Sequence, residues 1–207
     1  MHKSLSVSDV SRETLEKLKA FEALVLKWNP RINLVSKADA AHVWDRHIKD
    51  SLQLVNLTTD VSTWTDLGSG GGFPGIVVAI AVQYAQPQHM VLIDSDLRKC
   101  AFLKTAVREL ELSATVISDR LDAAQTPPSS TVSARALMPL DGLLGYCQRF
   151  LKPDGTALFQ KGRNWRDEVR DAERRWSFDL DVIDSKTSSD AAILRLSNIR
   201  KLPRHDR

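Results

Sequence analysis

Hydrophobic residues recur at helical spacing through the first 60 residues, with Glu and Lys between them. The spacing predicts a first helix that is capped by Ser8 or Asp9 and ended by Asn29-Pro30. A second helix is predicted over residues 39–55. Its buried face would consist of Val43, Ile48, Leu52 and Val55. Residues 1–60 are therefore expected to form a helical extension.

After residue 60, short apolar runs alternate with helical segments, which is typical of parallel strands connected by helices. Strands are predicted at 64–66, 90–93, 115–118, 131–136, 156–160, 178–183 and 191–196, and helices at 74–82, 98–110 and 140–151. Pro153-Asp154-Gly155 is expected to form a turn. The predicted architecture is a single α/β domain with a mostly parallel seven-stranded sheet, in which residues 61–207 form the core behind the extension.

The first predicted strand is joined to its helix by a glycine-rich turn, which ends in Phe73-Pro74-Gly75. Glycines permit positive φ and let a ligand lie against bare main chain, while the helix start offers unpaired N–H groups. A dinucleotide fingerprint would need glycine in place of Phe73. An acid followed by alternate glycines stands here instead: Asp66, Gly68, Gly70 and Gly72. This pattern indicates an S-adenosylmethionine (SAM) loop, whose carboxylate and amides would hold the methionine end; a purely structural turn is the alternative.

Polar residues at further strand ends are expected at the same edge of the sheet. Asp94 ends the second strand, where this type of fold binds ribose hydroxyls. The segment 119–122 follows the third strand and would flank an adenine. Arg135 leaves the fourth strand at the edge where sites form. A surface acid and a structural salt bridge are the alternatives for Asp94 and Arg135.

The second predicted helix carries His47, Asp50 and Ser51 on one face, because residues three and four apart are neighbours on a helix. An imidazole, a carboxylate and a hydroxyl on one strip can bind the edge of a substrate. The alternative is a plain polar face, with Arg46 and Asp50 as a weak surface ion pair.

Composition narrows the classes of function. The chain has 43% hydrophobic residues, a formal net charge of +3 and two cysteines without metal-ligand spacing. The charge permits an anionic partner without requiring one. The cysteine spacing gives no reason to expect a metal site. A cytoplasmic protein without a membrane segment is expected, because no signal peptide or long apolar run is present. The charged run 163–176 is expected to be a solvated face, and the basic tail 200–207 to be mobile.

Six motifs in chain order resemble the RsmG (GidB) family of bacterial methyltransferases. They are Trp28-Asn29 with Asn33-Leu34-Val35-Ser36, Arg46-His47-x-x-Asp50-Ser51, the loop from Asp66 to Gly75, Asp94-Ser95, Ser133-Ala134-Arg135-Ala136, and Lys161-Gly162 with Glu168. The resemblance spans about residues 28–170 and implies a Rossmann-like class I SAM-dependent methyltransferase. It further implies that a monomer methylates N7 of guanine 527, in the 530 loop of 16S rRNA, within a small-subunit particle or assembly intermediate.

The same resemblance implies which residues form the site. The expected SAM contacts are Gly68, Gly70, Phe73, Asp94, Leu121, Asp122 and Arg135. The expected RNA contacts are Arg46, His47, Arg120 and Lys161. Guanine N7 already has an in-plane lone pair, so no general base is expected. His47, Asp50 and Arg135 would instead orient the base.

Other chemistries fit the sequence less well. Ala134-Arg135-Ala136-Leu137 stands where methyltransferases of exocyclic amines carry a Pro-Pro motif, and neither cysteine has the adjacent proline of a cytosine-C5 enzyme. A small-molecule SAM methyltransferase, a non-catalytic SAM-binding or ribosome-associated factor, and an NAD-linked oxidoreductase remain as alternatives.

Overall fold

The computed structural model describes residues 10–83 and 88–203. Within them, a seven-stranded sheet has the order β3-β2-β1-β4-β5-β7-β6. The strands are β1 (Thr63–Leu67), β2 (His89–Asp94), β3 (Ala114–Ser118), β4 (Ser129–Arg135), β5 (Leu151–Lys161), β6 (Trp176–Asp184) and β7 (Ala192–Lys201). Strands β1 to β5 pair in parallel, and β7 is antiparallel to both β5 and β6. The predicted mostly parallel sheet is confirmed.

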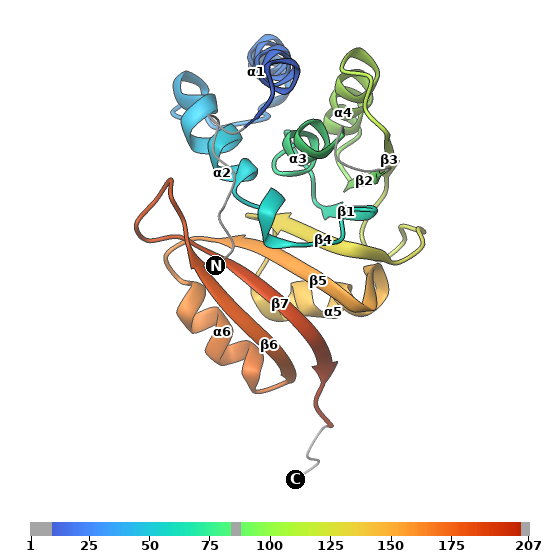
Figure 1. Cartoon of the computed structure of the whole chain (residues 1–207), viewed down its shortest axis with the longest axis vertical. Helices are drawn as coiled ribbons and strands as arrows, with labels where there is room; N and C mark the ends of the chain where they lie inside the picture. Colours follow the sequence, from blue (N-terminus) through green and yellow to red (C-terminus); the bar gives the residue numbers. More distant parts are fainter. Residues whose placement is uncertain (1–9, 84–87, 204–207) are drawn as a thin grey trace.

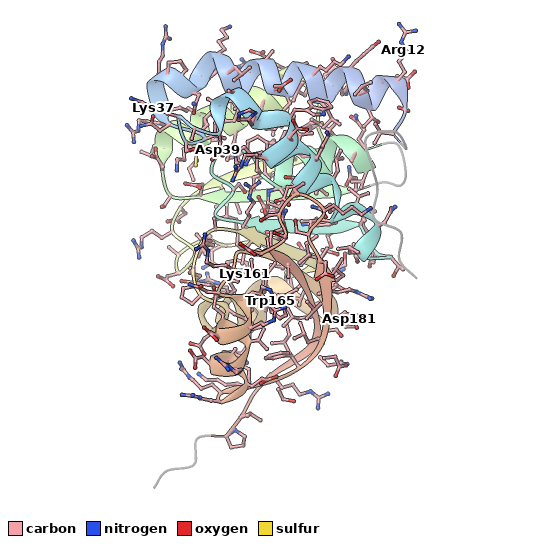
Figure 2. The ribbon with its side chains drawn as sticks, turned by 90° about the vertical axis from the view of Figure 1, so that its left-hand side faces the viewer. Arg12, Lys37, Asp39, Lys161, Trp165 and Asp181 are labelled. Atoms are coloured by element: carbon pink, nitrogen blue, oxygen red, sulfur yellow. The ribbon has the colours of Figure 1, made fainter. Side chains whose placement is uncertain are left out.

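Helices form a separate layer on each face of the sheet (Figure 1). One layer holds α1 (Arg12–Ile32), α2 (Lys49–Leu52), α3 (Gly75–Val82) and α4 (Leu97–Glu109), and α1 lies across the end of the molecule (Figure 2). The other layer holds α5 (Leu140–Phe150) and α6 (Trp165–Glu173). A buried apolar cluster lies under each layer. Among the described residues, no helix has the length and apolar character that a membrane crossing requires.

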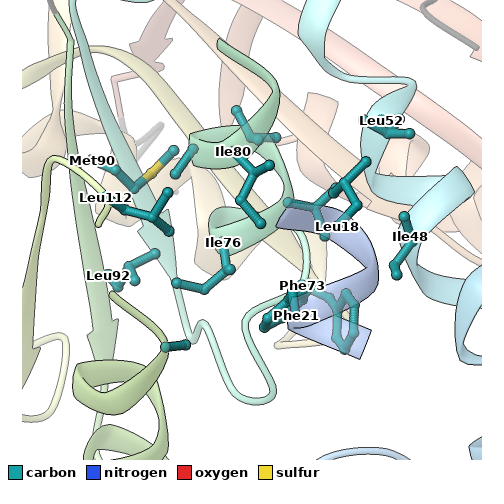
Figure 3. Close-up of a cluster of buried hydrophobic side chains, with 14 of the residues drawn as sticks. Leu18, Phe21, Ile48, Leu52, Phe73, Ile76, Ile80, Met90, Leu92 and Leu112 are labelled. Carbon is teal, nitrogen blue, oxygen red and sulfur yellow. The ribbon is translucent and has the colours of Figure 1, made fainter. Parts of the chain in front are cut away.

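Helix α3 is apolar on nearly every side, and its residues other than Ala81 are buried. Such a helix must be covered on all sides. In Figure 3, Ile76 and Ile80 lie between the side chains of β2 and those of α1, including Leu18. The extension therefore supplies the outer cover of the helix that follows the glycine loop.

Helix α1 differs from its predicted ends. It begins after Ser11, whose hydroxyl accepts a hydrogen bond from the Thr14 N–H at 3.2 Å; the expected caps at positions 8 and 9 lie outside the described residues. The predicted end at Asn29-Pro30 is wrong. A proline in the last turn removes only one donor, and the helix ends at Asn33, which has φ of 50° and donates its N–H to the Asn29 carbonyl.

The second predicted helix is not one regular α-helix. It is a succession of a 3-10 turn η2 (Ala40–His42), a π-helical segment η3 (Trp44–Ile48), α2, and a 3-10 turn η4 (Val55–Leu57). The predicted buried face is confirmed, since Val43, Ile48, Leu52 and Val55 are all buried. The π-helical segment buries the adjacent His47 and Ile48 together, and π-turns of this kind are frequent at functional sites.

The structure also bears on three predictions about the 153–155 turn, the C-terminal tail and the charged run. The predicted turn at 153–155 is wrong, because these residues lie within β5. They belong to an irregular stretch, 152–155, between the pairs Leu151–Ser129 and Thr156–Thr131. The mobile-tail prediction is wrong for residues 200–201, which pair with β6, while 204–207 lie outside the described residues. The charged run is a solvated face apart from Glu168, with the exposed Arg170 and Arg174 paired to aspartates three residues before them.

Candidate functional site

The glycine loop joins β1 to α3 at the carboxyl edge of the parallel strands. Gly68, Gly70 and Gly72 have φ of +66°, +52° and +86°, a region that glycine enters without strain. The nearest atom to a Cβ added at Gly70 is the carbonyl oxygen of Gly68, 3.8 Å away. The main chain at Gly70 is thus open to a ligand, whereas a Cβ at Gly68 would lie 2.5 Å from Leu137.

Asp66 does not face this opening. Its carboxylate is fully buried and accepts hydrogen bonds from the Ser133 hydroxyl at 2.6 Å and the Gly75 N–H at 3.2 Å. Burial raises the pKa of Asp66 to about 6, against the opposing effect of these hydrogen bonds. The expectation that this carboxylate holds the methionine end of SAM is therefore wrong. It fixes the two ends of the glycine loop to each other and to β4.

Gly75→Ala is expected to destabilise the protein. The added Cβ would lie 2.4 Å from Leu92 and 2.7 Å from the Asp66 carboxylate, and overpacking of this kind costs about 1–3 kcal/mol. Gly145→Ala in α5 is the control, because a Cβ there meets nothing within 4 Å. Thermal unfolding of both variants measures the difference, and equal melting temperatures would contradict the expected clash.

Asp94 ends β2 beside the glycine loop. Its two carboxylate oxygens accept the N–H groups of Gly70 and Asp96, each at 2.8 Å. A carboxylate oxygen accepts more than one hydrogen bond, so this half-buried group keeps capacity for a hydroxyl.

The turn after β3 is held by Arg149 of α5. This guanidinium donates to the carbonyl oxygens of Leu121, Asp122 and Ala124. The Asp122 side chain accepts a hydrogen bond from the Tyr146 hydroxyl at 2.6 Å. Sequence reasoning missed Arg149, because an arginine on an amphipathic helix carries no sign of which loop it reaches.

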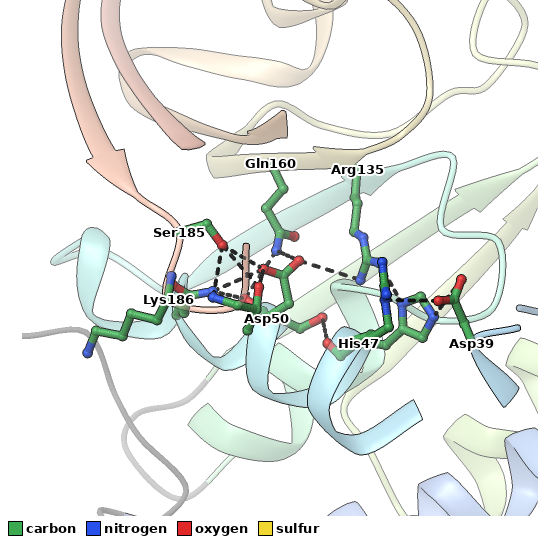
Figure 4. A network of polar contacts seen from close by, with 11 residues as sticks. Asp39, His47, Asp50, Arg135, Gln160, Ser185 and Lys186 are labelled. Atoms are coloured by element: carbon green, nitrogen blue, oxygen red, sulfur yellow. Dashed lines mark hydrogen bonds and ion pairs between the residues drawn. The ribbon is translucent and has the colours of Figure 1, made fainter. Parts of the chain in front are cut away.

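A row of polar side chains connects η3 to β4 (Figure 4). Arg135 Nη2 lies 2.5 Å from His47 Nδ1, and its Nη1 lies 3.6 Å from the Asp50 carboxylate. The His47 ring lies 4.9 Å from the Phe73 ring, centroid to centroid. Because Phe73 belongs to the glycine loop, the row begins at the predicted cofactor site and extends away from it.

His47 is neutral at pH 7. Burial, followed by the nearby Arg135 charge, lowers the pKa of His47 to about 4. Since Arg135 donates to Nδ1, the ring proton is on Nε2, which lies 3.9 Å from the Asp39 carboxylate. Asp39 in turn pairs with Arg46 at 2.9 Å, so the alternative Arg46–Asp50 ion pair does not form.

Asp50 ties the extension to two other segments. Its carboxylate accepts from Gln160 Nε2 of β5 at 2.5 Å and from the Thr187 hydroxyl of the β6–β7 loop at 2.6 Å. The predicted common face of residues 47, 50 and 51 holds for His47 and Asp50 alone. The prediction that Ser51 shares this face is wrong, because its buried hydroxyl donates a hydrogen bond to the His47 carbonyl at 2.7 Å.

A cavity of about 560 Å³ lies beside this row. We call it the β4–β5 pocket, since it is lined by η3, the ends of β4 and β5, and the β6–β7 loop. Asp39 and Lys161, which both line it, are labelled on the face shown in Figure 2. Lys161 is 8% exposed, and its ammonium group binds the Met138 carbonyl at 2.7 Å and the Glu168 carboxylate at 2.6 Å.

The structure brings three of the four predicted RNA contacts together, since Arg46, His47 and Lys161 all line the β4–β5 pocket. Arg120 follows β3 at the far edge of the sheet, where it is exposed and lies 3.8 Å from Asp122. Across the described residues, no three His, Cys, Asp or Glu side chains are grouped as metal ligands.

The strand order and the glycine loop after β1 define the fold of Rossmann-like class I SAM-dependent methyltransferases. A putative O-methyltransferase from Klebsiella pneumoniae has the same fold, with a TM-score of 0.59 and 15% identity over 92% of this chain and 98% of that one. A SAM-dependent methyltransferase from Aquifex aeolicus gives a TM-score of 0.58 at 14% identity, over 77% and 94% of the two chains.

The chain belongs to the rRNA small subunit methyltransferase G (GidB) family, whose model matches residues 14–193. The ribosomal RNA small subunit methyltransferase G of Ruegeria sp. (strain TM1040) is 47% identical over 94% of this chain and 95% of its own length. That of Gluconobacter oxydans is 46% identical over 95% of this chain and 100% of its own. The predicted family and the predicted class of SAM-dependent methyltransferase are confirmed.

Proposed function

We propose that the protein transfers the methyl group of SAM to N7 of a guanine in small-subunit rRNA. The proposed target is guanine 527 of the 530 loop. The relatives at 46–47% identity are named as methyltransferases of the small-subunit RNA. The observation that carries the proposal is the contact between His47 and Phe73, because it joins the glycine loop to the β4–β5 pocket. We further propose that the protein acts as a monomer, in the cytoplasm, on a ribosomal particle or assembly intermediate.

The residues at the strand ends fit a sulfonium nucleoside. Open main chain at Gly70 accepts a ligand at close approach, Asp94 keeps capacity for ribose hydroxyls, and Leu121 and Asp122 lie in the turn that would flank an adenine. SAM supplies an electrophilic methyl group when bound. Phe73 is 7% exposed, so we assign its role to its main chain and to its packing on His47.

The residues of the pocket orient a base rather than remove a proton. A neutral His47 at pH 7 and a cationic Arg135 present N–H groups, and guanine N7 needs no deprotonation before attack. Alignment of the attacking nitrogen with the methyl group can lower the barrier of such a reaction by several kcal/mol. Because the Arg135 guanidinium is turned toward His47 and Asp50, we assign it to the base in preference to SAM.

The cationic residues divide by exposure. Arg46 and Arg120 have side chains that are 67% and 78% exposed, and we assign them to RNA phosphates. Lys161 is buried between Met138 and Glu168 and acts at the wall of the pocket. A net charge of +3 gives only modest salt-dependent attraction, so recognition depends on a folded RNA with its target base exposed.

Strand scission at N7-methylguanine tests the proposed function. Small-subunit RNA is taken from cells that lack this activity, with and without expression of the chain. A new scission site at a single guanine in the 530 loop is expected only with the chain. Methyl incorporation at another atom, or into no ribosomal particle at all, would refute the proposal.

A further inference from the structure

We propose that Gln160 determines specificity for guanine by accepting a hydrogen bond from the N1–H group of the target base, an inference that rests on the proposed function. Gln160 lies near the end of β5 and pairs in register with Arg135 of β4. Its side chain is 7% exposed and lines the β4–β5 pocket.

Two glutamines hold Asp50 in the same manner. Gln53 Nε2 donates to the Asp50 carboxylate at 3.0 Å, and Gln160 Nε2 donates to it at 2.5 Å. The amide oxygen of Gln53 accepts the Lys186 N–H at 2.8 Å, whereas that of Gln160 has no hydrogen-bond partner among the described residues. A carboxylate accepts and never donates, so it fixes the orientation of the amide. The Gln160 oxygen is left on the Arg135 side (Figure 4).

Three buried polar atoms of this pocket lack a hydrogen-bond partner within the part of the chain that the structure describes. They are Gln160 Oε1, Arg135 Nη1 and His47 Nε2. Buried polar groups in native proteins are hydrogen-bonded as a rule, so three unpaired groups in one pocket indicate that a bound ligand pairs with them. Arg135 and His47 offer donors, and Gln160 offers an acceptor. A ligand that carries a hydrogen-bond acceptor next to a hydrogen-bond donor can pair with all three atoms.

The acceptor and donor groups of guanine follow one another in the same order as the strands that carry their partners. Along the edge of the base, N7 is followed by the O6 acceptor and then by the N1–H donor. Along the sheet, β1 with its glycine loop is followed by β4 with Arg135 and β5 with Gln160. With N7 toward the glycine loop, O6 meets Arg135 and His47, and N1–H meets Gln160. Adenine would set its amine against these donors and its bare N1 against the acceptor, so the pocket rejects it.

The inference is tested with guanine or 1-methylguanine at the target position of rebuilt small-subunit particles, and product nucleosides are measured by mass spectrometry. The wild-type protein is expected to methylate guanine and to reject 1-methylguanine, whose added methyl points at Gln160 Oε1. Gln160→Ala removes the acceptor and makes room. Its kcat/KM for guanine is expected to fall about tenfold, while 1-methylguanine becomes as good a substrate as guanine.

Gln53→Ala is the matched control, because it removes the same type of bond to Asp50 and the Gln53 side chain itself does not line the pocket. It is expected to keep rejecting 1-methylguanine. Gln160→Leu preserves side-chain volume in case the smaller residue prevents folding, and is expected to lower kcat/KM for guanine about tenfold with unchanged SAM binding.

The outcomes separate the inference from the proposed function. A Gln160→Ala protein that methylates guanine and still rejects 1-methylguanine overturns the inference alone, as does wild-type kcat/KM in Gln160→Leu. A wild-type protein that methylates no guanine in the particle overturns the proposed function and this inference with it.

Discussion

Arg135→Met is expected to lower kcat/KM for methyl transfer about a hundredfold or more. The variant keeps the length and apolar stem of the side chain and removes a cation that lies 2.5 Å from His47 and 3.6 Å from Asp50. Loss of one preorganised donor from a partly desolvated site costs about 10²–10³ in rate. Steady-state kinetics on small-subunit particles measure the loss, and calorimetry of SAM binding shows whether Arg135 also contacts the cofactor.

Arg195→Met is the control for Arg135→Met. Arg195 lies on β7, pairs with Asp181 at 3.0 Å and does not line the β4–β5 pocket. Its loss is expected to change kcat/KM less than twofold, because the residue lies outside the pocket and an ion pair with an exposed carboxylate contributes only about 0–1 kcal/mol to stability. Wild-type turnover in Arg135→Met, with both variants folded, would remove Arg135 from the site.

Asp66 and His47 are expected to give stability opposite dependences on pH. The pKa of Asp66 is raised from 3.8 to about 6, so its contribution is present below pH 4 and is lost as pH rises through 6. The pKa of His47 is lowered from 6.5 to about 4, so its contribution is present above pH 6.5 and is lost as pH falls through 4. Each shift of about two units or slightly more corresponds to about 3 kcal/mol, and the two partly cancel in the wild-type protein.

Asp66→Asn and His47→Gln separate these two contributions. Chemical unfolding is measured between about pH 4 and pH 7, and each variant is subtracted from the wild type so that shared carboxylates cancel. The stability advantage of wild type over Asp66→Asn is expected to shrink by about 3 kcal/mol as pH rises through this window. Its advantage over His47→Gln is expected to grow by a similar amount. Parallel curves for all three proteins would show that neither group is shifted.

The parts of the fold that depend on local pattern could be predicted from the sequence. Buried strands, the glycine turn and the acid at the end of β2 each follow from a few adjacent residues. The end of α1 could not, because Pro30 normally stops a helix and only the left-handed Asn33 shows where this one ends. The π-helical segment at 44–48 likewise lacks a distinctive apolar period.

Much of the site depends on contacts between distant parts of the chain. Gln160 and Thr187 bind Asp50 across 110 and 137 residues, and no local pattern announces such a pairing. The sequence suggests a ligand-binding carboxylate at Asp66, because its position at a strand end is visible in the sequence and its burial beside Ser133 is not. The resemblance to a family favours a site role for His47, which reasoning from spacing leaves open, and it adds Lys161, for which spacing gives no signal.

The glycine loop packs against the extension at several points, and this packing has a practical consequence. A Cβ at Gly71 would lie 2.7 Å from the Leu34 carbonyl, and the ring of Phe73 packs 5.3 Å from that of Phe21. A shortened chain that started at β1 would expose the apolar side of α3 to water and would remove the packing contacts of the glycine loop. A fragment that lacks residues 1–60 is therefore expected to aggregate and to lack activity.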